Sequence, residues 1–228
     1  MNLQWLFSLA FYTFVQANVE KTIFLAPPKT TLPDAGPTLE TLCLDQLTPS
    51  RAQVQTLLPV QFGRHTESWY LLRSLNTGQR YEVRLCWSAT QPSDFHLSTF
   101  TLPEVFDNPS LIASLANYSD NQQLKHKSGA CPTTSPSSPT TTKDSLLFLK
   151  IKATPEFLSS NITLMKNPPE VLVDIILDPF LLNIIPQSLV PIGLYIIAIG
   201  IAGYVLSGSI SRWLSRRAQL PKTKDKAI

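Results

Sequence analysis

The strongest constraint in this sequence is a segment of 23 residues without a single charge near the C-terminus, residues 188–210, SLVPIGLYIIAIGIAGYVLSGSI. A helix rises about 1.5 Å per residue, so this length suits one crossing of a hydrocarbon core that is roughly 30 Å thick. The tail after Ser211 carries six Lys or Arg against Asp225 alone, and positive charge stays on the cytoplasmic side of a membrane. We therefore predict a transmembrane helix at 188–210, with Trp213 as an interfacial anchor, and a basic cytoplasmic tail at 211–228. A cleaved lipid-anchor signal is the alternative. Such signals end in their hydrophobic run, whereas a basic tail follows the apolar segment here.

A second apolar stretch lies at the N-terminus, residues 5–15. It has the length of a signal-peptide core and is too short to span a bilayer. Val15 and Ala17 place modest side chains at positions −3 and −1, which predicts a signal peptide at 1–17. A buried helix at the start of the domain is the alternative. Together the two apolar segments predict a single-pass type I membrane protein whose residues 18–187 form a lumenal domain.

Two features of the membrane segment and tail suggest where the chain resides and what it contacts. Small residues, which let a partner helix approach closely, fall on one helical face at Gly193, Gly200, Gly203 and Ser207. The alternative is the general excess of glycine in membrane helices. Lys224 and Lys226 match a K-x-K-x-x endoplasmic reticulum (ER) retrieval signal, although a basic tail also produces this match by chance.

The lumenal residues predict a mostly β domain. A content of 43% hydrophobic and 15% charged residues excludes a disordered chain, and 19 prolines against 8 glycines suit strands joined by rigid turns. Apolar and aromatic runs predict strands at 21–26, 68–73, 81–88, 145–152 and 170–177, with a weaker one at 161–165 and a short helix at 103–115. Strands without intervening helices indicate a sandwich or a barrel. A Ser/Thr/Pro-rich loop at about 128–145 interrupts the domain, and sequons at Asn117 and Asn161 predict N-glycosylation.

The stretch LRSLNTGQRYEVRLCW, residues 72–87, predicts a strand, a turn and a second strand. Tyr81 and the alternate residues after it are apolar, whereas those between them are Glu82, Arg84 and Cys86, which gives one apolar and one polar face. Leu75, Gly78 and Tyr81 have the spacing L-x-x-G-x-x-Y. This spacing resembles a corner of fibronectin type III domains in which the tyrosine hydroxyl bonds to the turn backbone. We therefore expect a fibronectin III/immunoglobulin-like sandwich.

Three cysteines permit three single bridges, each of which leaves one thiol free. Cys43 and Cys86 lie in apolar, ordered-looking contexts, whereas Cys131 begins the Ser/Thr/Pro loop. We therefore favour a Cys43–Cys86 bridge. An intermolecular bridge through Cys131 and buried free thiols are the alternatives.

The sequence has little that indicates catalysis. The three histidines, His65, His96 and His126, lack metal-site spacing, and no nucleophile elbow, phosphate loop, C-x-x-C or D-x-D occurs. Asp174 and Asp178 are interpreted as solvated positions of a half-buried strand rather than as an acid–base pair. Trp87 is interpreted as sandwich core in preference to a surface binding site, and for Phe95 both interpretations stay open. We expect no catalytic residue, cofactor or metal, and no nucleic-acid partner because the basic balance lies in the tail.

Three blocks, VEKTIFLAP (19–27), ESWYLLRSL (67–75) and GQRYEVRLCWSATQPSDF (78–95), resemble a fungal family. It is the small co-activating subunit of the ER GPI (glycosylphosphatidylinositol) mannosyltransferase II complex. The resemblance implies a non-catalytic accessory role beside a multi-span mannosyltransferase. That partner would add the second mannose to the GPI precursor from dolichol-phosphate mannose.

Two other functions remain open on the sequence. One is a cell-surface fibronectin-like receptor or adhesion protein, which the ER retrieval signal disfavours. The other is a lumenal enzyme with an unrecognised site, which the missing catalytic motifs disfavour.

Overall fold

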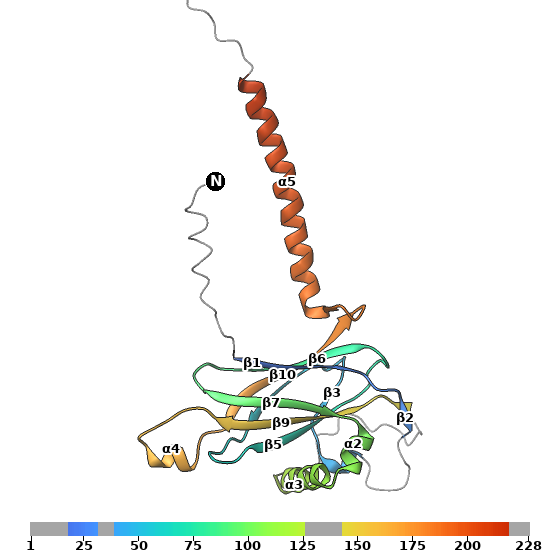
Figure 1. Cartoon of the computed structure of the whole chain (residues 1–228), viewed down its shortest axis with the longest axis vertical. Coiled ribbons are helices and arrows are strands. Elements are labelled where there is room, and N and C mark those ends of the chain that lie inside the picture. The colour runs from blue at the N-terminus through green and yellow to red at the C-terminus, as the bar shows by residue number, and fades with distance from the viewer. Residues whose placement is uncertain (1–17, 32–38, 126–142, 219–228) are drawn as a thin grey trace, which may run out of the picture.

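Two β-sheets face each other, and a long helix rises from the end of one of them (Figure 1). The computed structural model describes residues 18–31, 39–125 and 143–218. The predicted signal peptide, most of the Ser/Thr/Pro loop and the retrieval signal lie outside these residues. The mostly β architecture with one C-terminal apolar helix confirms the predicted fold class at this level.

The first sheet is antiparallel throughout and contains the strand that leads to the long helix. Its order is β1 (Val19–Leu25), β6 (Arg80–Trp87) and β10 (Val171–Leu181). The first half of β10 also pairs with β4 (Gln53–Leu58), and its last two residues pair with β11 (Ile185–Pro186). At 11 residues, β10 is the longest strand described, so it connects the sandwich core with the base of the helix.

The second sheet lies below the first in Figure 1. Its order is β3 (Gln46–Leu47), β5 (Thr66–Leu72), β9 (Leu147–Pro155) and β7 (Ser93–Phe100). The β3–β5 pair is parallel and the other two pairs are antiparallel. A separate two-residue ladder joins β2 (Thr30–Thr31) to β8 (Lys143–Asp144).

The second sheet is buried on both faces, which explains the unbroken apolar runs of β5 and β9. Tyr70 and Leu72 enter the core between the two sheets, whereas Trp69 and Leu71 pack on the opposite face. That opposite face is covered by the helices η1 (Leu39–Leu42), α2 (Leu102–Asp107) and α3 (Pro109–Lys125). Strands covered on both faces lose the period-two alternation of a half-exposed strand.

The helix expected at 103–115 is two helices. Asn108 precedes Pro109, and a proline disfavours helical backbone in the residue before it. Asn108 is accordingly extended, with φ −110° and ψ 107°. Its side chain accepts a hydrogen bond from the backbone N–H of Ser110 (3.0 Å), so it ends α2 and begins α3.

The weak strand expected at 161–165 is wrong. Asn161 is the N-cap of a short helix, α4 (Ile162–Lys166), and its side chain accepts from the N–H of Thr163. An asparagine that satisfies a free N–H favours a helix start over a strand. The strands β4 and β7 were not predicted, although Phe95 and Leu97 of β7 alternate with exposed residues.

The corner at residues 72–81 connects the two sheets, because β5 belongs to the second and β6 to the first. Tyr81 is fully buried, and its hydroxyl accepts a hydrogen bond from the backbone N–H of Asn76 (3.1 Å). Gly78 has φ +75°, a conformation that residues with a side chain rarely adopt. The predicted tyrosine corner is therefore confirmed. The narrower fibronectin or immunoglobulin topology stays a prediction.

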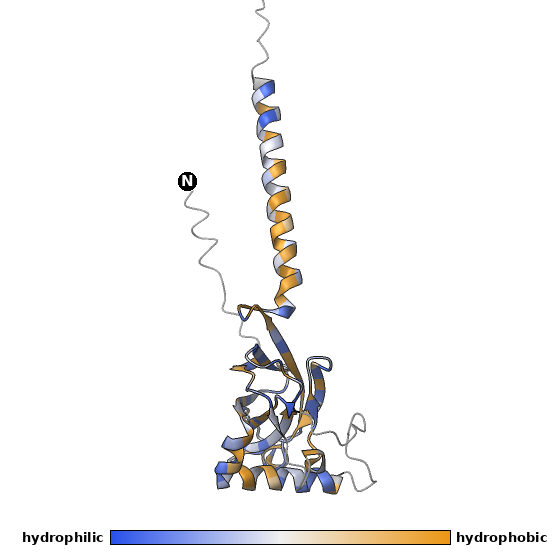
Figure 2. Ribbon diagram, turned by 90° about the vertical axis from the view of Figure 1, so that its right-hand side faces the viewer, coloured by the Kyte–Doolittle hydropathy of each residue, from blue (hydrophilic) through white to orange (hydrophobic). Residues whose placement is uncertain are grey.

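The long helix α5 (Val190–Ala218) follows a turn of 3₁₀ helix, η2 (Gln187–Leu189). Figure 2 shows an apolar band along most of α5, with hydrophilic residues near its C-terminal end. Residues 187–216 form the one helix in the described part of the chain that is long and apolar enough to cross a membrane.

Replacing Tyr81 by Phe should destabilise the sandwich by about 1 kcal/mol, because the N–H of Asn76 loses its acceptor in the corner. Urea unfolding of the detergent-solubilised chain, followed by tryptophan fluorescence, measures this change. Tyr195→Phe, at an exposed position on α5, is the matched control. An unchanged midpoint for Tyr81→Phe would show that the hydroxyl contributes nothing to the corner.

Candidate functional site

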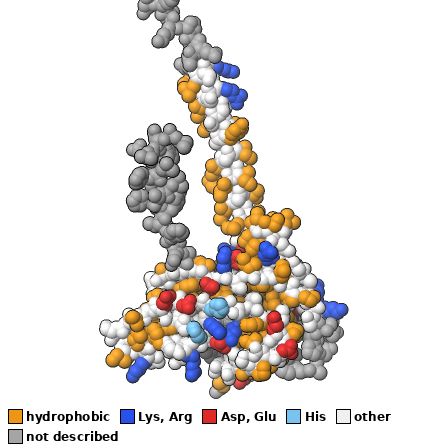
Figure 3. Space-filling view, in the orientation of Figure 1, with side chains coloured by type: hydrophobic (Ala, Val, Ile, Leu, Met, Phe, Trp, Pro, Cys, Tyr) orange, Lys and Arg blue, Asp and Glu red, His pale blue; other side chains and the backbone are white. Residues whose placement is uncertain are grey.

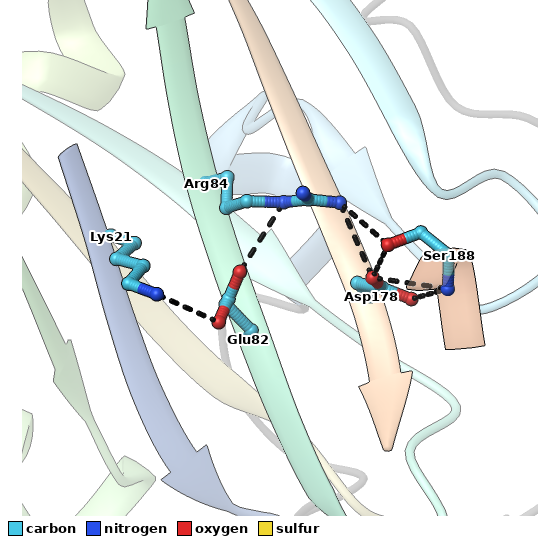
Figure 4. Close-up of polar contacts among 5 residues, drawn as sticks. All are labelled: Lys21, Glu82, Arg84, Asp178 and Ser188. Carbon is cyan, nitrogen blue, oxygen red and sulfur yellow. Dashed lines mark hydrogen bonds and ion pairs between the residues drawn. The ribbon is translucent and has the colours of Figure 1, made fainter. Parts of the chain in front are cut away.

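A cluster of charged side chains joins β1, β6 and β10 of the first sheet to Ser188 in η2, the turn that precedes α5 (Figure 4). The strand β6 supplies Glu82 and Arg84 from its polar face, because its apolar residues face the core between the sheets. The neighbouring strand β10 supplies Asp178, which is paired in register with Glu82. Lys21 of β1 completes the set from the edge of the sheet, with its Nζ 3.6 Å from Glu82 Oε2.

Arg84 holds this cluster together by reaching across two strands. Its Nε lies 3.3 Å from Glu82 Oε1, and its Nη2 lies 3.2 Å from Asp178 Oδ2. The same Nη2 donates to the hydroxyl of Ser188 in η2 (3.1 Å). One guanidinium therefore contacts the two central strands of the sheet and the turn that begins the long helix.

Asp178 caps the N-terminus of the helical segment from the adjacent strand. The backbone N–H of Ser188 lies 3.3 Å from Asp178 Oδ1, and the Ser188 hydroxyl donates to Oδ2. The first N–H groups of a helix have no partner within it, and a negative charge there is favourable. The N-cap residue itself, Pro186, makes no side-chain cap, so Asp178 takes that role.

The two carboxylates of the cluster are buried, its two cations reach solvent, and their charges balance. Glu82 and Asp178 are only 4% and 5% exposed, and two cations balance the two carboxylates. Buried charges are tolerated when they are paired, and removing one partner leaves an uncompensated charge. The earlier interpretation of Asp178 as a solvated position is therefore wrong. Its ion-pair partner is Arg84 on the neighbouring strand β6, and the pairing of these two strands cannot be read from the local sequence.

Replacing Asp178 by Ala should destabilise the chain by about 3 kcal/mol, the lower end for breaking a buried ion pair. It leaves Arg84 with one carboxylate and leaves the Ser188 N–H without its acceptor. Thermal unfolding in detergent measures the effect. Asp94→Ala, at an exposed position on β7, should leave stability unchanged. Equal midpoints for the two variants would contradict an anchoring role for Asp178.

A second polar group fastens α3 to the outer face of the second sheet. Lys150 Nζ lies 2.7 Å from Glu67 Oε1 and 5.4 Å from the centre of the Trp69 ring. Ser114 of α3 accepts from Trp69 Nε1 (2.9 Å) and donates to Glu67. Burial raises the pKa of Glu67, but its hydrogen bonds to Lys150 and Ser114, together with the nearby lysine charges, lower the pKa by more. The net result is a pKa below the usual value, which indicates a carboxylate held by structure.

A cleft of about 950 Å³ lies beside this group, between α3 and the β4–β5 connection. Arg64, His65 and Asn117 are among its lining residues, and all three are exposed. His96 lies elsewhere, on β7, paired in register with Lys152. No group of three His, Cys, Asp or Glu within the described ranges is arranged to hold a metal ion.

The cysteine pairing differs from the prediction. Cys86 has a free thiol, whereas Cys43 is disulfide-bonded, so the expected Cys43–Cys86 bridge is wrong. Cys86 lies opposite Val19 and Asp174 on the outer face of the first sheet. Cys43 directly follows η1. Its neighbour Leu44 belongs to the hydrophobic cluster between α3 and the second sheet, on the face of that sheet that points away from the first sheet. The third cysteine, Cys131, lies outside the described residues.

Cys86 is not an activated nucleophile. Burial raises the pKa of its thiol; the charge of Arg84 opposes this rise and that of Asp174 adds to it, and the net shift is upward. A reactive cysteine needs the opposite shift, since the thiolate is the attacking form. Trp87 beside it packs against the core between the sheets, with its ring 4.7 Å from that of Phe95. The core interpretation of Trp87 is therefore confirmed, and Phe95 is a core residue as well.

The other predicted positions are exposed or lie outside the described chain. Asn117 is exposed in α3, and Asn161 is exposed at the cap of α4. Asn161 uses its Oδ1 as the cap, which leaves Nδ2, the atom that carries an N-linked glycan, available. Lys224 and Lys226 fall outside the described residues.

The glycines at 193, 200 and 203 of α5 make no close packing contact with the described residues. A Cβ atom added to Gly193, Gly200 or Gly203 would meet nothing within 4 Å. Ser207 is exposed on the same helix. These positions therefore tolerate side chains as far as the described chain is concerned, and their role as a partner face stays a prediction.

A family model for the GPI-mannosyltransferase II co-activator matches residues 9–125, just over half of the chain. The chain belongs to this co-activator family. The match contains the three sequence blocks that carried the resemblance, and it includes β1, β6 and the tyrosine corner. Neither the curated proteins nor the solved structures include a significant match.

Membership in a co-activator family is consistent with the supporting role that the charged residues have in the structure. A co-activator acts on GPI mannosyltransferase II, so its partner is that enzyme and its process is GPI-anchor biosynthesis, which involves the ER. Sequence reasoning missed the roles of Asp178 and Ser188 at the start of the helical segment. A serine just before an apolar helix was an available signal for a helix start, but the capping carboxylate comes from another strand and has no local signature.

Proposed function

We propose that this chain is a non-catalytic accessory subunit of the ER GPI mannosyltransferase II complex. It supports addition of the second mannose to the GPI precursor by a multi-span catalytic partner. The observation that carries the proposal is the co-activator family match over residues 9–125. The catalytic groups and the mannose donor belong to the partner, and this chain stabilises or activates it.

In this proposal the chain is a type I membrane protein. The sandwich lies in the ER lumen, α5 crosses the membrane, and the basic tail is cytoplasmic. Arg212 and Arg216 at the end of the apolar band of α5 support this orientation, because basic residues stay on the cytoplasmic side. Lys224 and Lys226 would return the protein to the ER, and glycans at Asn117 and Asn161 would then stay sensitive to endoglycosidase H.

The helix α5 is the proposed contact with the partner inside the membrane. Gly193, Gly200, Gly203 and Ser207 leave a shallow face on which another helix can approach closely. This face is free of contacts in the described chain at its three glycines. The sandwich would contribute by holding α5 at a fixed position through the cluster around Arg84.

Purification of the tagged chain in mild detergent should recover the mannosyltransferase, identified by mass spectrometry. Replacing Gly200 and Gly203 by Leu should reduce that recovery by about tenfold or more, because the added side chains separate the helices. Replacing Ile197 and Ile201 by Leu, two exposed positions of the same helix, is the matched control. Insertion is checked by carbonate extraction for all forms.

Two results would contradict the proposal at different levels. A stable glycosylated preparation without the enzyme would refute the accessory role and favour a cell-surface protein. Full recovery with the Gly200 and Gly203 variant would refute only the helix face.

A further inference from the structure

The hairpin between β10 and β11, residues 180–186, exposes a group of aliphatic side chains beside the base of α5. Leu181 and Leu182 are 52% and 84% exposed, and Ile184 and Ile185 are 72% and 48% exposed. Figure 3 shows hydrophobic side chains gathered over the top of the sandwich where α5 begins. Exposed apolar groups of this kind mark contact surfaces in proteins.

The turn of this hairpin is strained at a leucine. Leu182 has φ +52° and Asn183 has φ +60°, and the N–H of Ile184 donates to the carbonyl of Leu181 (3.1 Å). A β-turn with positive φ at both central positions is of type I′ and favours Gly, Asn or Asp there. Asn183 fits that preference and Leu182 does not. A bulky residue held in such a conformation at the most exposed point of the hairpin suggests a role outside the sandwich.

The hairpin is held rigidly against the tyrosine corner. The Asn183 side chain accepts from the N–H of Arg80 (2.8 Å) and donates to the carbonyl of Gly78 (3.0 Å). Gln79 donates its side-chain N–H to the carbonyl of Phe180 (3.0 Å). The position of Leu182 is therefore set by the β5–β6 corner.

The hairpin lies at the level where α5 leaves the hydrocarbon core of a membrane. The uncharged segment 188–210 is about 34 Å long at 1.5 Å per residue, close to the thickness of that core. Ser188 therefore lies at the membrane boundary, and only one residue, Gln187, separates it from β11. Figures 1 and 2 show the hairpin beside the first turn of α5.

The composition of the hairpin favours lipid over protein as its occupant. The exposed side chains of residues 181–185 are aliphatic apart from Asn183, which is engaged with the corner. Protein interfaces are enriched in aromatic residues and arginine, and residues 181–185 include neither. The nearest arginine, Arg80, lies over the ring of the buried Phe180 (5.9 Å). Aliphatic side chains next to a membrane helix match the acyl region of a bilayer.

We propose that the β10–β11 hairpin inserts Leu182, Ile184 and Ile185 into the lumenal leaflet of the membrane. With α5, the hairpin is a second point of attachment, so the sandwich cannot rotate about the base of the helix. The outer face of the first sheet is then held toward the membrane surface. The inference rests on the proposed membrane span but not on the identity of the partner.

Spin labelling of the full chain in phosphatidylcholine vesicles tests this inference. A ketone-bearing amino acid that accepts a nitroxide is placed at Leu182, and the native cysteines stay unchanged. Separate samples carry the label at Ile197 in α5 and at Leu158, an exposed leucine near α4. Power saturation then compares accessibility to oxygen, which concentrates in lipid, and to a nickel chelate, which stays in water.

The label at residue 182 should have an oxygen-to-nickel accessibility ratio several-fold above that at residue 158. Its ratio should be closer to the ratio at residue 197 than to that at residue 158. A ratio at 182 equal to that at 158 would place the hairpin in water and overturn the proposal. A label shielded from both reagents would indicate a protein occupant and would overturn it as well. If the label at 197 is also in water, the proposed span itself fails, so the two failures are distinguishable.

A Leu182→Asn variant separates folding from membrane contact. Asparagine suits positive φ, so the unfolding midpoint in detergent should stay equal or rise. In vesicles, a nitroxide at Ile184 should become several-fold more accessible to the nickel chelate in this variant. Unchanged accessibility at residue 184 would show that Leu182 does not hold the hairpin in lipid.

Discussion

The contact of Arg84 with Asp178 and Ser188 is the interaction on which the rest of the structure depends. It joins the two central strands of the first sheet to the turn that begins the membrane helix. In the described part of the chain, α5 packs mainly on η2, and η2 packs on β10, so this contact lies on the route that joins the helix to the sheet. Charge neutrality makes this contact compatible with burial, since Glu82 and Lys21 balance the remaining charges.

The outer faces of the two sheets have different surroundings: helices cover that of the second sheet, whereas that of the first sheet carries the charged cluster. The second sheet is covered by the opposing sheet and by α2 and α3, so its outer side is a packed layer. The first sheet has a core side and an open side that carries the charged cluster and the apolar hairpin. The open side is the one from which α5 rises, so polar support and apolar surface meet where the chain reaches the membrane.

The sequence predicts the elements whose signals are local. Five strands, the tyrosine corner, the apolar helix and the family resemblance all follow from short patterns. The break at Asn108 and the cap at Asn161 also have local signals. The neighbouring residues, however, favour one continuous helix at 103–115 and a strand at 161–165. The cysteine pairing and the anchoring cluster could not be predicted, because they depend on which strands are neighbours. Glu82 and Asp178 are 96 residues apart in the chain and directly paired in the sheet.

The central claim is that the charged cluster fixes the sandwich relative to α5. Pulsed electron–electron double resonance between nitroxides at His96 on β7 and Ile199 on α5 measures this most directly in vesicles, with Leu182→Asn present in both forms so that the proposed attachment through the hairpin is removed. The account predicts a single narrow distance distribution for the native cluster and a clearly broader one after Arg84→Ala. A broad distribution with the native cluster, or an equally narrow one in both forms, would contradict the account.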